Sequence, residues 1–215
     1  MTPTDLIEID QDQPAAEAIA AAAAQIRRGG VVAIPTDALY TLVADPFNLQ
    51  AVRRVFAAKG RESLYSLPLL VSDFLMAEEL VKEPPVRFNL LVRRFWPGPL
   101  TIIVKAGCKL PLRSTANTGN VALRVPAAAI PRAVVKRFGL PITATSANLR
   151  GASECVDAAS VLDQIGDLIP LIVDGGPTGH TLPTTIVDLT LGEGRWEILR
   201  EGAIPAHEIV MALHR

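Results

Sequence analysis

A continuous apolar run at residues 31–34, Val-Val-Ala-Ile, constrains the fold of this chain most strongly. A strand that is apolar on both faces must be covered on both faces, as in a sheet that is flanked by helices. Similar runs recur and alternate with amphipathic helical patterns, for example at residues 49–59, where Asn48 is suited to cap the helix. The alternation predicts one α/β domain with a twisted, mixed parallel and antiparallel sheet flanked by helices.

The ends of the predicted elements follow from capping residues, prolines and glycines. We predict strands at residues 6–9, 31–34, 67–71, 100–105, 121–125, 142–145, 171–174, 185–189 and 196–199. We predict helices from Pro14 to Arg28 with Asp12 as the cap, at residues 49–59, 73–80 and 85–95, between Pro131 and Gly139, and at residues 157–164 and 205–213.

Charge and cysteine content narrow the class of protein. Lys and Arg total 21 and Asp and Glu total 22, so any basic binding surface must be local. Cys108 and Cys155 are far apart and lack histidine partners at ligand spacing, which predicts no metal site built from protein side chains. Isolated cysteines fit a reducing compartment, the N-terminus lacks a secretion signal, and the apolar run at residues 18–24 is too short to span a membrane. We therefore expect a soluble cytoplasmic protein without membrane contact.

Two polar clusters follow apolar or helical patterns early in the chain. Pro35-Thr36-Asp37 comes directly after the strand at residues 31–34, and Lys59-Gly60-Arg61 ends the next predicted helix. Ligands of open α/β sheets bind at strand ends, and a lysine close to an arginine suits an anionic ligand. Alternatively, Gly60 takes the left-handed position after a helix and Lys59 stabilises the helix C-terminus, and both interpretations can hold together.

Three later positions carry similar chemistry. Arg124 lies in an apolar strand, where it needs either an internal carboxylate or a bound anion, and the sequence leaves both open. The stretch Thr145-Ser146-Ala147-Asn148 can hold a phosphate or a sugar hydroxyl, or can form a turn that bonds its own backbone. Arg200 follows a late strand and can contact a ligand or form a surface ion pair with Glu201. Together these groups favour a nucleotide or another phosphate ligand.

Several short motifs occur in a fixed order. They are Pro35-Thr36-Asp37-Ala38-Leu39-Tyr40, Lys59-Gly60-Arg61, Trp96-Pro97-Gly98-Pro99-Leu100-Thr101, Val121 to Pro126, Ser146-Ala147-Asn148, Thr184-Thr185-Ile186-Val187-Asp188 and Ile198-Leu199-Arg200-Glu201-Gly202. In this order the chain resembles the YrdC family of threonylcarbamoyl-AMP synthases. The resemblance implies a YrdC-like domain with a concave ligand cleft over residues 14–204. It also implies an N-terminal strand and lead-in at residues 1–13, a C-terminal helix on the same domain at residues 205–215, and the short form without the extra C-terminal domain of longer relatives.

The resemblance implies a nucleotidyltransferase activity. Such a protein joins L-threonine, bicarbonate and ATP into threonylcarbamoyl-AMP and releases pyrophosphate, with Mg²⁺ accompanying the ATP. A downstream transferase complex then moves the threonylcarbamoyl group to an adenosine of tRNA. Transfer of this kind needs alignment and charge neutralisation more than covalent help from the protein.

The resemblance also assigns roles to single residues. Lys59 and Arg61 are implied as catalytic residues that hold ATP phosphates. The implied threonine and carbamoyl contacts are Thr36, Tyr40, Arg124, Ser146 and Thr184, and the implied nucleotide contacts are Lys59, Arg61, Asn120, Asn148 and Arg200.

Two positions depart from the family pattern on the amino-acid side of the expected site. Ala38 replaces a threonine, and Leu70 stands where a histidine is common. Two alternatives to the synthase stay open, the first because of these departures and the second because the resemblance also implies a link to RNA binding. One is a divergent paralogue, similar to the YciO branch, with a different substrate. The other is a non-catalytic module that binds double-stranded RNA or tRNA through a local basic patch.

Overall fold

The computed structural model describes residues 3–60, 66–108, 117–179, 182–192 and 194–214. The helices are α1 (Ala16–Arg27), α2 (Leu49–Ala58), α3 (Phe74–Glu78), α4 (Val86–Phe95), α5 (Ala129–Phe138), α6 (Ala158–Ile165) and α7 (Ala206–Leu213), with a 3-10 turn η1 (Gly166–Leu168). The strands are β1 (Asp5–Glu8), β2 (Val32–Ile34), β3 (Thr41–Val43), β4 (Leu69–Leu70), β5 (Leu100–Lys105), β6 (Asn120–Arg124), β7 (Ile142–Thr143), β8 (Thr145–Ser146), β9 (Leu171–Asp174), β10 (Thr185–Asp188) and β11 (Glu197–Arg200).

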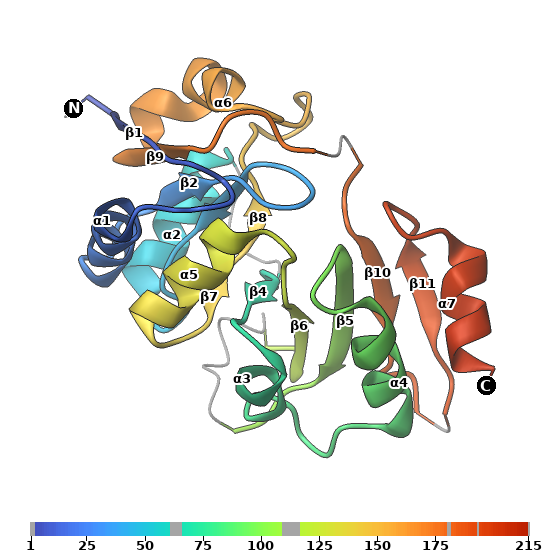
Figure 1. Cartoon of the computed structure of the whole chain (residues 1–215). Helices are drawn as coiled ribbons and strands as arrows, with labels where there is room; N and C mark the ends of the chain where they lie inside the picture. The colour runs from blue at the N-terminus through green and yellow to red at the C-terminus, as the bar shows by residue number, and fades with distance from the viewer. Residues whose placement is uncertain (1–2, 61–65, 109–116, 180–181, 193, 215) are drawn as a thin grey trace.

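The α/β class is confirmed, and the strands divide between two sheets. A five-stranded sheet has the order β1-β9-β2-β3-β8, and a six-stranded sheet has the order β11-β10-β5-β6-β4-β7. Both sheets mix parallel and antiparallel pairs, such as β2 with β9 and β2 with β3 in the first sheet. Figure 1 shows the two sheets, with α1 and α5 on the first and α4 and α7 on the second.

The predicted strand at residues 142–145 is divided between the two sheets. Ile142 and Thr143 pair with β4 in the six-stranded sheet, whereas Thr145 and Ser146 pair with β3 in the five-stranded sheet. The chain thus passes from one sheet to the other at Ala144, whose amide donates to the Pro68 carbonyl over 2.7 Å. One apolar segment in the sequence therefore serves both sheets.

The run at residues 31–34 is buried on both faces, as predicted. Val32 and Ile34 pack with α1 and α5, whereas Val31 and Ala33 pack with α2 and α6. Side chains of a strand alternate between its faces, so these four residues bury both sides of the five-stranded sheet.

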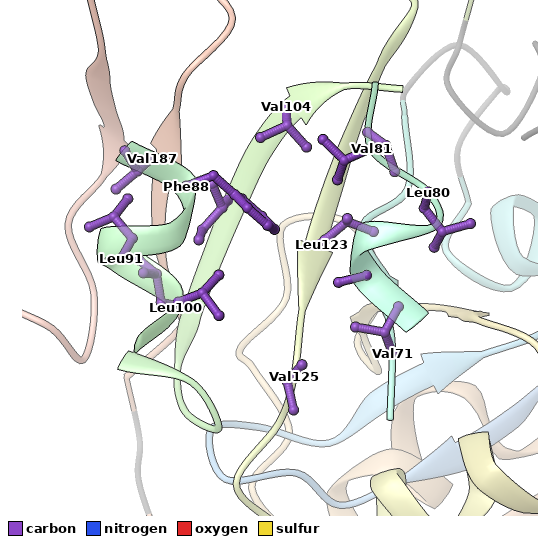
Figure 2. Packing of buried hydrophobic residues seen from close by; sticks show 14 of the residues in the cluster. Val71, Leu80, Val81, Phe88, Leu91, Leu100, Val104, Leu123, Val125 and Val187 are labelled. Atoms are coloured by element: carbon purple, nitrogen blue, oxygen red, sulfur yellow. The ribbon is translucent and has the colours of Figure 1, made fainter. Parts of the chain in front are cut away.

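The six-stranded sheet is covered on one face by α3, α4 and α7, and α5 packs on the other face at Leu70 and Ile142, in the β4–β7 end of the sheet. Leu100, Ile102 and Val104 of β5 join the core beneath these helices, together with alternate residues of β6 and β10. Figure 2 shows Phe88 and Leu91 of α4 beside Leu100 and Val187 in this core. The intervening residues of these strands, which include polar side chains, therefore point toward the opposite face of the sheet.

Several predicted helix ends are confirmed and one is corrected. The Asn48 side chain accepts hydrogen bonds from the amides of the first turn of α2, and Gly139 ends α5 with φ +86°. Asp12 does not cap α1, because the helix begins four residues later at Ala16 and Ala15 is its capping residue. The Asp12 amide instead donates to Asp10 Oδ1 over 2.8 Å. Among the described residues, no helix combines the length and the apolar character that crossing a membrane requires.

Candidate functional site

A cavity of about 330 Å³ lies between the two sheets. Its lining from the six-stranded sheet includes Thr101, Arg124 and Arg200, which come from β5, β6 and β11. Thr41 and Ser146, from β3 and β8, contribute from the other sheet. The volume is near the lower end of the range of small-molecule sites, about 300–1,000 Å³. The strand ends that the sequence indicated therefore meet around one hollow.

Arg124 has an internal carboxylate partner, which was the first of the two alternatives for this residue, and it also lines the cavity. Its Nη2 atom lies 2.7 Å from Asp37 Oδ1, and its Nε donates to the Gly98 carbonyl over 3.0 Å. Arg124 is only 5% exposed, yet it lines the cavity. The Oδ2 atom of Asp37 is buried and has no hydrogen-bond partner among the described residues. The fork of Arg124 is thus held from behind while it faces the cavity.

Arg200 is anchored to β10 rather than paired with Glu201. Its Nε donates to the Thr184 carbonyl over 2.9 Å and its Nη2 donates to Thr184 Oγ1 over 3.0 Å. Thr184 Oγ1 in turn lies 3.0 Å from Thr101 Oγ1, and all three residues line the cavity. Burial lowers the pKa of Arg200, Glu154 opposes this effect and Arg124 adds to it. The guanidinium still carries its charge at neutral pH, because its ordinary pKa is so high.

Ser146 and Asn148 form a compact polar turn at the wall of the cavity. Ser146 Oγ donates to Asn148 Oδ1 over 2.7 Å, and Asn148 Nδ2 donates to the Ala152 carbonyl over 2.8 Å. The motif therefore forms a turn that bonds its own residues, as one interpretation predicted, and it also lines the cavity. Thr36, which also lines the cavity, organises a second turn by donating to the Leu39 carbonyl over 2.9 Å.

Lys59 does not display its ammonium at the surface of the cleft. The residue is 2% exposed and its Nζ donates to the carbonyls of Ser146 and Asn148, the latter over 3.0 Å. The same Nζ donates to Asn148 Oδ1 over 3.1 Å. Gly60 follows with φ +61°, as predicted for a helix end, and this turn directs Lys59 inward beneath the Ser146–Asn148 turn. The second cation of the motif, Arg61, lies outside the described residues.

Tyr40 and Asn120, which were predicted to contact ligands, are absent from the described lining of the cavity. Tyr40 is fully buried and its hydroxyl donates to the Gly176 carbonyl over 2.8 Å. Burial raises the pKa of Tyr40, and the nearby Asp174 carboxylate adds to the effect. Asn120 is the first residue of β6 and Arg124 is the last. Four residues of a strand span about 13 Å, so Asn120 lies far from the Arg124 end that lines the cavity. The polarity of a side chain did not indicate which end of the strand faces the ligand.

Several lining residues were not among the predicted contacts. Thr101 and Glu154 contribute a hydroxyl and a carboxylate, and Ala38 and Leu70 contribute apolar surface. The alternation of β5 could have indicated Thr101, since its neighbours on the strand are apolar. No sequence signal marks Glu154, which lies in the irregular segment before α6. The two apolar departures from the family pattern therefore do face the cavity.

The described part of the site contains no arrangement of side chains typical of a protein-bound metal. Among the described residues, no group of three or more His, Cys, Asp or Glu side chains is placed to hold a metal ion. The arrangement instead offers two guanidinium groups, hydroxyls and backbone dipoles. Such groups bind an anion and align it.

Known proteins match this chain over most of its length. The Sua5/YciO/YrdC family model, described as "Telomere recombination", matches residues 24–202. A threonylcarbamoyl-AMP synthase of Bacillus subtilis (strain 168) is 39% identical over 194 residues, which are 89% of this chain and 55% of that protein. The chain thus spans about half the length of this relative.

Two solved structures resemble the whole fold. The crystal structure of P. abyssi Sua5 complexed with L-threonine has a TM-score of 0.91 and 34% identity, and the match covers 97% of this chain and 61% of that one. The crystal structure of E. coli YciO has a TM-score of 0.85 and 27% identity, and the match covers 93% of this chain and 96% of that one.

Proposed function

We propose, because the chain belongs to the Sua5/YciO/YrdC family, that it makes threonylcarbamoyl-AMP from L-threonine, bicarbonate and ATP. The observation that carries this proposal is the single cavity between the two sheets. In it, Arg124 and Arg200 approach one hollow from β6 and β11, together with hydroxyls from both sheets. The names of the B. subtilis and P. abyssi relatives support the same substrates.

The proposed reaction joins two anions. Threonine and bicarbonate first combine, with loss of water, to threonine carbamate. An oxygen of its carbamate group then attacks the α-phosphorus of ATP, the bond to the oxygen that bridges to the β-phosphate breaks, and pyrophosphate leaves with the electron pair. Cationic side chains must offset the repulsion between the two anions and hold them in line. The protein is therefore a nucleotidyltransferase that acts mainly by alignment.

We assign the threonine carboxylate to Arg124. A guanidinium fork pairs with a carboxylate through two parallel hydrogen bonds, and this requires a fork that cannot rotate. Asp37 and the Gly98 carbonyl hold the guanidinium of Arg124, and neither residue is in the described lining of the cavity. Asp37 is thus a positioning residue, and Thr36 and Thr184 add hydroxyls to the threonine and carbamoyl side.

We assign the nucleotide to Arg200 and the Ser146–Asn148 turn. Arg200 is held by Thr184, so its charge stays at the wall of the cavity. Lys59 acts through this turn, because its ammonium bonds the two carbonyls that shape it. Arg61 remains a proposal from the family motif, as a cation for the ATP phosphates. In the lining that the structure describes, Glu154 is the carboxylate suited to assist a Mg²⁺ ion that arrives with ATP.

The proposed product needs a partner. A carbamoyl adenylate is a reactive mixed anhydride, so a second protein must pass its acyl group to a nucleophile. We propose a downstream transferase complex that acts on tRNA. Cys108 and Cys155 are both free thiols, which fits this chemistry in the reducing cytoplasm.

One observation favours a second candidate. Ala38 and Leu70 give the cavity apolar surface where the family pattern has polar groups. A site without those hydrogen-bond partners discriminates less strongly for a hydroxyl-bearing amino acid. A YciO-like synthase that acts on another amino acid or carbamate is therefore the second candidate, and the likeness to E. coli YciO supports it.

Pyrophosphate release tests the proposal. We expect the wild type to release pyrophosphate from ATP and bicarbonate only when threonine is present. Arg200→Gln should slow this release by about 10- to 100-fold, the loss expected for charge-assisted hydrogen bonds to the ligand. Arg53→Gln, at an exposed position of α2, is the matched control and should stay within twofold of the wild type.

The amino-acid dependence separates the two candidates. Release that threonine stimulates at least tenfold more than serine or valine supports the threonine synthase. Equal stimulation by all three amino acids supports the YciO-like candidate, and no stimulation by any of them contradicts both.

A further inference from the structure

A second cavity, of about 280 Å³, opens at the far end of the six-stranded sheet. β5 runs from Thr101 in the first cavity to Lys105 in the second, a distance of about 13 Å for four residues of strand. Figure 2 shows the core beneath this sheet, with Val125 and Val104 at opposite ends of the cluster. The second cavity is therefore a separate site, to which the proposed synthase reaction assigns no role.

Basic side chains dominate the described lining of this cavity. Lys82, Arg87, Lys105 and Arg195 face it from the start of α4, the end of β5 and the loop after β10. Glu83 is the acidic residue in the described lining, and no ion pair joins it to these cations within the described part of the chain. The described lining thus has four positive charges against one negative, in a chain whose formal net charge is −1.

Arg87 supplies the second observation. Its Nε atom is buried and has no hydrogen-bond partner among the described residues. An added Cβ at Gly194 would lie 2.7 Å from Arg87 Nη1, so the guanidinium lies against bare backbone that has φ +70°. A buried donor without an acceptor is unfavourable, because it has lost its hydrogen bonds to water. An anion in this cavity would supply acceptor oxygens to the guanidinium.

The backbone around Arg87 adds to the positive potential. Arg87 lies in the first turn of α4, and Pro85, the capping residue, gives this turn no side-chain cap. The N-terminus of a helix of this length carries partial positive charge and free amide groups. Thr190, which also lines the cavity, accepts a hydrogen bond from Asn120, so the polar residue that the sequence linked to a nucleotide lies beside this site.

We propose that this second cavity binds a compact phosphoanhydride anion with two or three phosphate groups. Cations converge on it from three segments of the chain, which suits a small ligand enclosed by the protein more than a long polyanion lying across a surface. The excess of three positive charges in the described lining matches a di- or triphosphate at neutral pH. The shared chemistry is the phosphoanhydride, whether it is inorganic or forms the tail of a nucleotide.

Calorimetric titration with inorganic pyrophosphate tests this site. The variant Lys82→Gln/Lys105→Gln removes two charges from exposed side chains and should weaken binding at this site at least tenfold. The control Arg53→Gln/Lys136→Gln removes two charges at exposed positions on other helices and should change binding less than twofold. Equal weakening in both variants would overturn the proposal. So would the loss of all saturable pyrophosphate binding in Arg200→Gln, because binding would then occur only in the first cavity.

Two further measurements separate this site from the first cavity and identify the source of the anion. In two-dimensional NMR spectra, pyrophosphate should shift the amide signals of Gly192 and Gly194 in the wild type and in Arg200→Gln, but not in Lys82→Gln/Lys105→Gln. Shifts confined to the Ser146–Asn148 turn would contradict the proposal. Titration with ADP then distinguishes the two sources of the anion. If ADP binds the wild type more tightly than pyrophosphate does, and this binding is lost in Lys82→Gln/Lys105→Gln, the ligand is the phosphate tail of a nucleotide. Threonine-dependent pyrophosphate release should be unchanged in this variant, so the outcome is independent of the proposed synthase activity.

Discussion

Replacing Lys59 with methionine tests whether a buried ammonium holds the Ser146–Asn148 turn. Methionine keeps most of the apolar stem of lysine and removes the charge and the three donors. The lysine is 2% exposed, and its Nζ bonds two main-chain carbonyls and the Asn148 Oδ1 atom. If Lys59 were a surface residue of the cleft, its removal would leave the stability of the fold unchanged.

The expected magnitude follows from opposing terms. Hydrogen bonds to a charged donor stabilise by about 1.5–3 kcal/mol each, whereas burial of the ammonium costs several kcal/mol. Lys59→Met recovers the burial cost but leaves two carbonyl oxygens without this donor, at about 1–3 kcal/mol each. We therefore expect the free energy of unfolding to fall by about 3 kcal/mol. For a chain of this size that corresponds to a drop in Tm of about 6–12 °C.

Urea unfolding of both proteins measures this difference. Lys136→Met, at an exposed position of α5, is the matched control and should change stability by less than about 0.5 kcal/mol. The slope of the transition with urea should be the same in all three proteins, because the folded and unfolded states expose the same surface. A Lys59→Met variant within about 0.5 kcal/mol of the wild type would refute the reasoning.

Three other predictions follow from buried or capping groups. Asp37→Asn leaves the Arg124 charge without its carboxylate and should destabilise the fold by about 3 kcal/mol, and a double-mutant cycle with Arg124→Met, followed by urea unfolding, should give a coupling energy above about 1 kcal/mol. Since burial raises the pKa of Tyr40, the folded state holds this proton more tightly than the unfolded state. Stability should then fall as pH rises above about 10 in denaturant titrations, and Tyr40→Phe should flatten that slope. Asp157 caps α6 by accepting from the Ser160 amide, which lowers its pKa. Its contribution should be lost as pH falls through about 4, and Asp157→Ala should cost about 1 kcal/mol by thermal unfolding at neutral pH.

Local signals predicted the elements that depend on local physics. Asn48 and Gly139 mark helix ends because a side-chain oxygen or a left-handed residue satisfies backbone groups within one turn. β3 was missed because three residues are too few to show a period, and its identity depends on pairing with β2. The break at Ala144 was missed for a related reason, since only the positions of two separate partner strands reveal it.

The candidate site was predictable in its chemistry and less so in its geometry. Arg124 and Arg200 do share a cavity, because each lies at the end of a strand of one sheet. The sequence around Lys59, in contrast, is that of any helix end with a cation, and the burial of Lys59 depends on a turn that is almost 90 residues away in sequence. Tyr40 is polar and follows a motif residue, yet its hydroxyl is used by the Gly176 carbonyl. Whether a polar group binds a ligand or the protein itself is decided by tertiary packing.

The position of the cavity follows from how each sheet is covered. The five-stranded sheet buries both faces under helices, and it contributes to the first cavity through its β3–β8 edge. The six-stranded sheet buries one face under α3, α4 and α7, and Thr101, Arg124 and Ile186 point the other way. A face that carries an arginine and threonines cannot close as a dry core without leaving buried polar groups unsatisfied. The edge of one sheet therefore meets this face of the other around a polar hollow, and the chain joins the two at Ala144. The same alternation that builds both cores thus also places the ligand cavity between them.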